Sequence, residues 1–146
     1  GNATHWPHNK EFNLYQDVAG ARIVFGCEVP LVQLPCMGVV SAFTTSGPEL
    51  EYHLRGKNKL CDYLVDVTTK EAMECYGGST WTRPIWDVTA VAWLLDGDFM
   101  EESLIHSPIP EYDDQYAYDN NRHFIKYVYY INRDNLFADL FKKLTK

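Results

Sequence analysis

Apolar residues near the start of the chain first repeat at helical spacing and then form a continuous run. Four of them recur every three or four positions and predict an amphipathic helix over residues 15–25, namely Leu14, Val18, Ala21 and Phe25. The run Val29–Leu34, closed by Pro35, predicts a strand that is buried on both faces. A helix followed by a buried strand is typical of an α/β unit.

The middle of the chain predicts two helices that pack as a pair. Ser46-Gly47-Pro48-Glu49 resembles a capping box with proline at the first helical position, so a helix is expected from there to about Gly56. A longer helix is expected from Lys59, and its predicted apolar face consists of Leu60, Leu64, Val67 and Cys75.

A loop that starts in the glycine-rich stretch 77–80 extends to Trp86, and a third helix is expected from Asp87. Its apolar stripe makes it the most buried helix that the sequence predicts, and the stripe consists of Val88, Val91, Ala92 and Leu95. The helix is expected to end at the turn Asp96-Gly97-Asp98.

The last third of the chain predicts a hairpin and a closing helix. Two β-prone runs, 103–112 and 122–131, are separated by the polar residues 113–121. Asn132 is expected to cap a helix with the apolar face Leu136, Phe137, Leu140, Phe141 and Leu144. No repeat or linker interrupts the sequence, so residues 1–146 are interpreted as part of one α/β domain.

Composition and charge narrow the function classes. The chain has 146 residues, of which 46% are hydrophobic and 23% charged, as in a globular protein. Its formal net charge of −7 disfavours nucleic acids and anionic membranes as partners. No apolar run reaches the roughly 20 residues of a membrane helix. The four cysteines have neither CxxC nor zinc-site spacing, which favours free thiols in a reducing, cytoplasmic compartment.

Two short motifs carry side chains suited to sugar and base recognition. Glu11 and Asn13 stand two residues apart before a helix, where an extended backbone directs both to one side and both can grip sugar hydroxyls. The alternative is that Asn13 is a helix N-cap. Trp86 can stack on a planar ligand, and Asp87 can bind a hard cation such as calcium. The alternative is that Asp87 caps the following helix while Trp86 packs as a hydrophobic staple.

Other chemistries find little support in the sequence. His5 and His8 stand three residues apart without a third metal ligand, which favours solvated loop histidines. The sequence contains no GxSxG, P-loop or GxGxxG motif, so it does not indicate nucleophilic catalysis or a phosphate cradle. One carboxylate cannot hold calcium, which takes about six to eight oxygen ligands.

Taken in order, the two motifs and their flanks resemble the inosine-uridine preferring nucleoside hydrolase family. The similar stretches are residues 11–25, which begin Glu11-Phe12-Asn13, and residues 86–95, which begin Trp86-Asp87. The resemblance implies the C-terminal half of a Rossmann-like domain, with a mainly parallel central sheet flanked by helices. That family hydrolyses the N-glycosidic bond of ribonucleosides, using a calcium ion that binds an activated water and the ribose diol.

Matched position by position, the resemblance implies that Asp87 is a calcium ligand and that Asn2, Glu11 and Asn13 contact the ribose. Many family members have histidine where this chain has Trp86, and purine-preferring members resemble this chain in having tryptophan, which stacks on the base. The resemblance therefore implies a purine nucleoside substrate and a role in purine salvage. Three residues of the preceding loop are candidates for a lid over the substrate, namely Tyr76, Trp81 and Arg83.

The family's N-terminal DxDxxxDD signature, which supplies most calcium ligands and the general base, is absent from these 146 residues. The resemblance thus implies a chain that is catalytic only when an N-terminal half, as a separate chain, completes it. The start at Gly1, in a turn-rich stretch, agrees with a processed, tagged or truncated chain. Members are often dimers or tetramers, so a homo-oligomer is a further expectation.

Two other function classes stay open. One is a non-catalytic module that binds nucleosides or sugars, and the other is a structural domain in which Asn13 and Asp87 are helix caps. A half-domain would expose sheet edges and apolar helix faces, so the isolated chain is expected to aggregate or to fold poorly.

Overall fold

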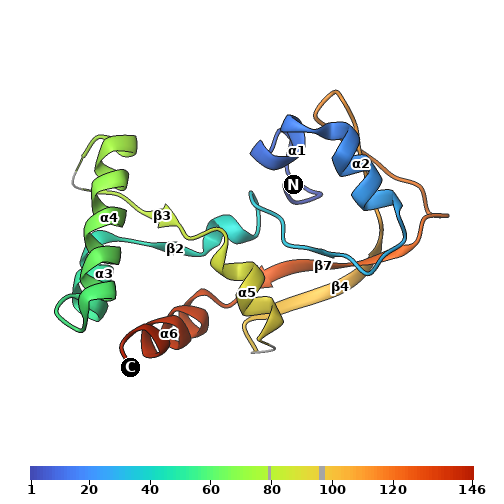
Figure 1. The fold of residues 1–146 in the computed structure, drawn as a ribbon. Helices are drawn as coiled ribbons and strands as arrows, with labels where there is room; N and C mark the ends of the chain where they lie inside the picture. The colour runs from blue at the N-terminus through green and yellow to red at the C-terminus, as the bar shows by residue number, and fades with distance from the viewer. Residues whose placement is uncertain (79, 96–97) are drawn as a thin grey trace.

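The computed structural model describes residues 1–78, 80–95 and 98–146, and it contains a mixed sheet with accompanying helices (Figure 1). The strands lie in the order β1-β7-β4, where β1 is Val32–Gln33, β7 is Phe124–Ile131 and β4 is Met100–His106. β1 pairs with β7 in parallel, whereas β4 pairs with β7 in antiparallel orientation with an irregularity between Glu101 and Glu102. Helices together with parallel strand pairing confirm the predicted α/β class.

The strand predicted at residues 29–34 is shorter and more exposed than expected. β1 contains only Val32–Gln33, and Val29 is 53% exposed. Within the described part of the chain β1 pairs with β7 alone, so one of its edges has no neighbouring strand. The prediction of a strand buried on both faces is therefore wrong for this chain.

Residues 12–26 form two helices in place of the single predicted one. α1 comprises Phe12–Gln16 and α2 comprises Val18–Gly26. The Asp17 carboxylate between them accepts a hydrogen bond of 2.8 Å from the Gly20 N–H and caps α2. Because an N-cap residue adopts a non-helical backbone, Asp17 ends one helix and starts the next.

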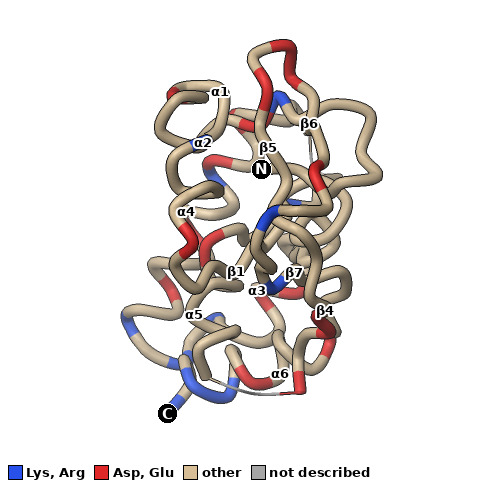
Figure 2. The backbone as a smooth tube through the Cα atoms, turned by 90° about the vertical axis from the view of Figure 1, so that its right-hand side faces the viewer, with Lys and Arg blue, Asp and Glu red and all other residues tan. Residues whose placement is uncertain are grey.

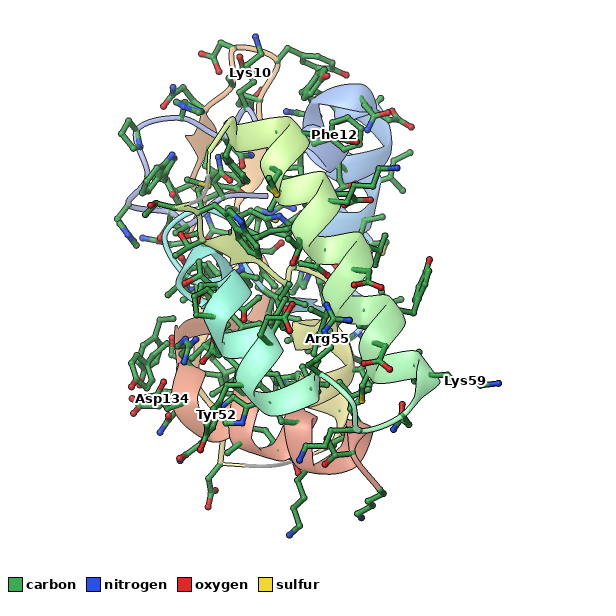
Figure 3. All side chains as sticks on the ribbon, turned by 90° about the vertical axis from the view of Figure 1, so that its left-hand side faces the viewer. Lys10, Phe12, Tyr52, Arg55, Lys59 and Asp134 are labelled. Atoms are coloured by element: carbon green, nitrogen blue, oxygen red, sulfur yellow. The ribbon has the colours of Figure 1, made fainter. Side chains whose placement is uncertain are left out.

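The helices α3 (Gly47–Leu54) and α4 (Lys59–Tyr76) form the predicted pair (Figure 1). Arg55, labelled in Figure 3, connects them through ion pairs of 2.8 Å to Glu51 on α3 and Asp66 on α4. The predicted capping box does not form, because Ser46 makes no side-chain capping bond. The Glu49 carboxylate instead accepts a hydrogen bond of 2.8 Å from Thr45 Oγ1.

The buried face of α4 is displaced from the predicted one. Cys61, Val65 and Ala72 are buried, whereas the predicted Leu60 and Cys75 are exposed. Neighbouring residues of a helix point about 100° apart, so a phase error of one residue exchanges buried and exposed positions.

The helix α5 (Val88–Leu94) buries only part of its predicted apolar stripe. Thr89 and Ala92 are buried, but the apolar residues Val91, Leu94 and Leu95 are exposed, Leu94 by 73%. Half of the predicted stripe, Val91 and Leu95, is exposed, whereas Ala92 is buried and Val88 packs against the core, so the helix is less buried than predicted. The predicted turn at 96–98 falls mainly on residues 96 and 97, which lie outside the described residues.

The core contains aromatic stacking at α6 (Arg133–Leu144), next to buried residues of β7. Phe43, which follows the short 3₁₀ helix Val40–Ala42, stacks on Phe137 of α6 with ring centroids 4.1 Å apart. Asn132 caps α6 as predicted, since its side chain accepts a hydrogen bond from the Asn135 N–H. The predicted apolar face of α6 is confirmed by its buried residues Leu136, Phe137 and Phe141.

The predicted hairpin forms between β4 and β7 and carries a second small ladder. β5 (Ile109–Pro110) pairs with β6 (Tyr116–Ala117), so part of the predicted loop is a short antiparallel ribbon. A further ribbon pairs β2 (Thr44–Thr45) with β3 (Arg83–Pro84) and fixes the segment that precedes Trp86.

Figure 2 shows several basic residues near the C-terminus and others in the rest of the molecule, interspersed with acidic residues. None of the helices in the described ranges combines the length and apolar character that crossing a bilayer requires.

Candidate functional site

A pocket of about 540 Å³ lies between the N-terminal segment and the start of α5. Four stretches that are far apart in the sequence line this pocket, and they contribute Asn2, Lys10, Glu11, Phe12, Asn13, Cys36, Met37, Trp86 and Asp87. The fold therefore brings together all five residues singled out from the sequence. The volume of this pocket lies in the range of small-molecule binding sites.

Glu11 is the organising residue of the first motif. It is the N-cap of α1, where its Oε2 accepts a hydrogen bond of 3.2 Å from the Leu14 N–H. Its Oε1 accepts a hydrogen bond of 2.9 Å from the Asn13 side-chain amide. The alternative in which Asn13 caps the helix is wrong, because Asn13 lies inside α1 and is exposed.

The Glu11 carboxylate is buried yet remains easily ionised. Burial acts to raise the pKa of Glu11, whereas hydrogen bonds from the backbone N–H groups of Asn13 and Leu14 act to lower it, and the net result is a lowered pKa. The pocket therefore holds a fixed negative charge beside the Asn13 amide, an arrangement able to accept hydrogen bonds from hydroxyl groups.

Cys36 forms the pocket wall beside Glu11. Its Sγ lies 3.6 Å from Glu11 Oε1, and burial, together with the nearby carboxylates of Glu11 and Asp87, raises the pKa of the thiol to about 11. The side chain is thus a neutral thiol at physiological pH. Sequence reasoning missed Cys36 and Met37, although both follow the predicted parallel strand, and ligands of α/β sheets bind at the carboxyl ends of such strands.

The second motif is held through its backbone. The Ile85 N–H donates to the Phe43 carbonyl (3.0 Å), and Thr89 Oγ1 donates to the Trp86 carbonyl (2.7 Å). Trp86 is 38% exposed and borders the pocket. Trp86 is thus held by its backbone while part of its surface remains exposed beside the pocket.

Asp87 presents a free carboxylate. It occupies the N-cap position of α5 with a helical backbone (φ −81°, ψ −19°) and makes no side-chain capping bond. Among the described residues it has neither a hydrogen-bonded side-chain partner nor an ion pair. The alternative of a capping role is therefore not supported by its geometry, since an N-cap normally has an extended backbone.

Asn2 lines the pocket and is only 1% exposed. Its Nδ2 donates to the His8 carbonyl (3.2 Å), and its Oδ1 accepts from the Met37 N–H (3.2 Å). The Asn2 side chain thus forms hydrogen bonds to the backbone at His8 and at Met37.

The described residues do not form a complete calcium site. No group of three or more histidine, cysteine or acidic side chains is placed to hold a metal in residues 1–78, 80–95 and 98–146. Asp87 offers a free carboxylate, whereas both Glu11 oxygens already accept hydrogen bonds. The chain can supply one ligand from Asp87, but calcium needs several more oxygen atoms.

The three candidate lid residues do not line the pocket. Trp81 is buried in the core, and Arg83 pairs with Glu71 of α4 at 2.8 Å. Tyr76 is the exposed last residue of α4. Two of the residues that precede Trp86 thus contact the core and α4 in place of the pocket.

Comparison with known proteins yields a likeness in fold. No family model and no curated protein matches the sequence. Among solved structures, a plant nucleoside hydrolase, the PpNRh1 enzyme, superposes with a TM-score of 0.75 at 18% sequence identity. The match covers 92% of this chain and 47% of the plant enzyme, so the chain spans about half the length of that structure. The chain therefore has the fold of about half of a nucleoside hydrolase.

Proposed function

We propose that this chain is the C-terminal, nucleoside-contacting segment of a ribonucleoside hydrolase that releases a base from ribose. The observation that carries the proposal is the convergence of Glu11, Asn13, Trp86 and Asp87 on one pocket. The fold likeness to a plant nucleoside hydrolase supports the same reading independently of these side chains.

The proposed roles follow from the state of each side chain. The ionised Glu11 accepts hydrogen bonds from ribose hydroxyls, and the adjacent Asn13 amide donates hydrogen bonds to them. The accessible Trp86 indole stacks on the base, and its large surface favours a purine. The Glu11 carboxylate is already held by hydrogen bonds within the chain. It therefore loses little conformational freedom when the sugar binds, which favours affinity.

The proposal assigns the metal to a site shared between two segments. Asp87 supplies one ligand to calcium, and an N-terminal half of the same domain supplies the other ligands and the general base. Bound calcium provides a more acidic water and a point of attachment for the ribose diol. We place the activity in cytoplasmic purine salvage, with homo-oligomers of the completed domain as a further part of the proposal.

A nucleoside-binding or sugar-binding module without catalysis is the second candidate. It is favoured by the lack of a metal-binding cluster in the described ranges together with an intact Glu11–Asn13 pair. The two candidates differ in whether a segment with several carboxylates accompanies this chain.

The deciding experiment uses the protein purified from its source in its native form. Denaturing mass spectrometry establishes whether this sequence is joined to, or associated with, an acidic segment, and a reducing-sugar assay measures ribose released from inosine with and without calcium. Calcium-dependent release supports the hydrolase. A lone 16.9 kDa species that binds inosine without releasing ribose supports the binding module.

Base stacking is tested in the same native form with Trp86→Ala. Loss of one aromatic stacking partner is expected to weaken inosine binding by about tenfold, since base stacking contributes about 1–3 kcal/mol. Tyr52→Ala is the matched control, because Tyr52 is 81% exposed and lies outside the pocket. Absence of any binding of inosine, uridine or ribose by the unmodified protein would refute both candidates.

A further inference from the structure

The segment Gly1–Ala3 is hydrogen-bonded to Cys36 and Met37, which line the pocket. The Cys36 N–H donates to the Gly1 carbonyl (2.8 Å), and the Ala3 N–H donates to the Met37 carbonyl (2.9 Å). The Met37 N–H donates to Asn2 Oδ1 between these two bonds. The position of the Cys36–Met37 wall is therefore set by this segment, with Asn2 at its centre.

A buried polar cluster fixes the Asn2 backbone from the other side. The Tyr116 hydroxyl donates to the Asn2 carbonyl (3.2 Å) and accepts a hydrogen bond of 3.1 Å from Gln33 Nε2. Gln33 Nε2 also approaches the Asn2 carbonyl at 3.4 Å, and the Asn2 N–H donates to Asn9 Oδ1 at 2.9 Å. Asn2 thus has partners on its backbone N–H, its backbone carbonyl and its side chain.

The packing at this cluster leaves no spare volume. A Cβ placed on Gly1 would overlap the Tyr116 hydroxyl and would lie 3.0 Å from Asn9 Oδ1. Tyr116 itself is not part of the pocket lining. Its hydroxyl can therefore influence the pocket only through the residues that it holds.

From this geometry we infer that Asn2 is a positioning residue rather than a ribose contact, and that Tyr116 and Gln33 extend the positioning network beyond the pocket. The inference rests on the proposed function, because it divides the pocket residues into ligand contacts and supports. Asn2 is only 1% exposed, one of its side-chain N–H groups donates to the His8 carbonyl, and its Oδ1 accepts from the Met37 N–H. Asn13 is exposed and is the corresponding ligand contact.

A set of deoxy ligands distinguishes a contact from a support. The ligands are a C-nucleoside, whose base is attached by a carbon–carbon bond that is not hydrolysed, and its 2′-, 3′- and 5′-deoxy analogues. Calorimetry on the native protein measures the dissociation constants for the unmodified form and for the variants Asn2→Ala, Tyr116→Phe and Asn13→Ala. Tyr118→Phe is the matched control, because Tyr118 lies near Tyr116 and is exposed.

A positioning residue weakens all four ligands by the same factor, because it shifts the pocket wall and touches no hydroxyl. We expect about a three- to tenfold loss for Tyr116→Phe and Asn2→Ala across the set, as for one or two lost hydrogen bonds. Asn13→Ala should instead lose most of its effect against the analogue that lacks the hydroxyl contacted by Asn13. An Asn2→Ala effect confined to one analogue would overturn the inference.

A second measurement is independent of nucleoside binding. Hydrogen exchange of the Met37 amide, which is bonded to Asn2 Oδ1, is expected to be several-fold faster in Tyr116→Phe and unchanged in Tyr118→Phe. Unchanged exchange in Tyr116→Phe would overturn the network even if Asn2→Ala did not fold. Failure of the unmodified protein to bind any of the ligands would refute the proposed function, while the exchange rates would still decide the role of Tyr116.

Discussion

The Glu11–Asn13 pair and the Trp86–Asp87 pair border the same pocket, yet their side chains are held in opposite ways. Glu11 is buried and accepts hydrogen bonds from the Asn13 side chain and the Leu14 N–H. Asp87 is exposed, and its carboxylate has no bonded partner among the described residues. The first pair is hydrogen-bonded within the chain, whereas the carboxylate of the second pair is exposed.

This contrast separates two kinds of functional residue. A side chain that is fixed before binding contributes to affinity, because its freedom is already lost. A free carboxylate costs little in the folded chain and becomes valuable only when a cation is present. Variants of the two pairs should therefore differ in whether they alter stability or activity.

The largest effect is expected for Asp87→Asn in the native protein. If Asp87 binds the proposed calcium, kcat/KM for inosine should fall on the order of 100-fold, because metal catalysis contributes several kcal/mol. The free energy of unfolding should change by less than about 0.5 kcal/mol, as for other exposed sites. Ribose release and urea denaturation measure the two quantities, and retained activity would exclude Asp87 as a ligand.

The thiol of Cys36 reports on the buried side of the pocket. Since its pKa is raised to about 11 from a reference of 9.0, its thiolate fraction near neutral pH is about 100-fold below that of an unperturbed thiol. Iodoacetamide should therefore modify the exposed Cys27 much faster than Cys36, as followed by peptide mass spectrometry. Equal rates for the two cysteines would contradict the buried, carboxylate-flanked wall.

The smallest effect is expected for Glu11→Gln, as a change in stability and its pH dependence. Loss of the charged cap should lower the free energy of unfolding by about 1 kcal/mol at pH 7. A carboxyl whose folded pKa is lowered stabilises the fold above its unfolded pKa, about 4.3, and this contribution is lost as the pH falls through the folded pKa. Urea titrations from pH 7 to pH 3 should thus show the two proteins converging, and parallel curves would refute the assignment.

The sequence predicted local features better than their surroundings. The C-terminal helix with its Asn132 cap, the hairpin and the α3–α4 pair follow from short-range patterns, and the structure confirms them. The two pocket motifs were also visible as short patterns. Their meeting in one pocket depends on tertiary packing, which spacing in the sequence does not reveal.

Burial was the least predictable property. The apolar stripe of α5 was expected inside, but its residues Val91 and Leu95 are exposed, because a pattern identifies an apolar face and not the element that covers it. Asp17 was placed within one helix, whereas its carboxylate competes for a backbone N–H and divides the helix in two. Cys36 and Tyr116 escaped notice because their roles depend on partners about 25 and 114 positions away.

The bond from the Tyr116 hydroxyl to the Asn2 carbonyl spans 114 positions, and the bond from the Thr4 N–H to the Tyr127 hydroxyl spans 123. Closing loops of this length is entropically costly and slows folding compared with local contacts. During synthesis on a ribosome, the first residues of the chain must wait until residue 127 has left the exit tunnel before they can dock. The pocket wall nearest the N-terminus is therefore among the last parts of this chain to assemble.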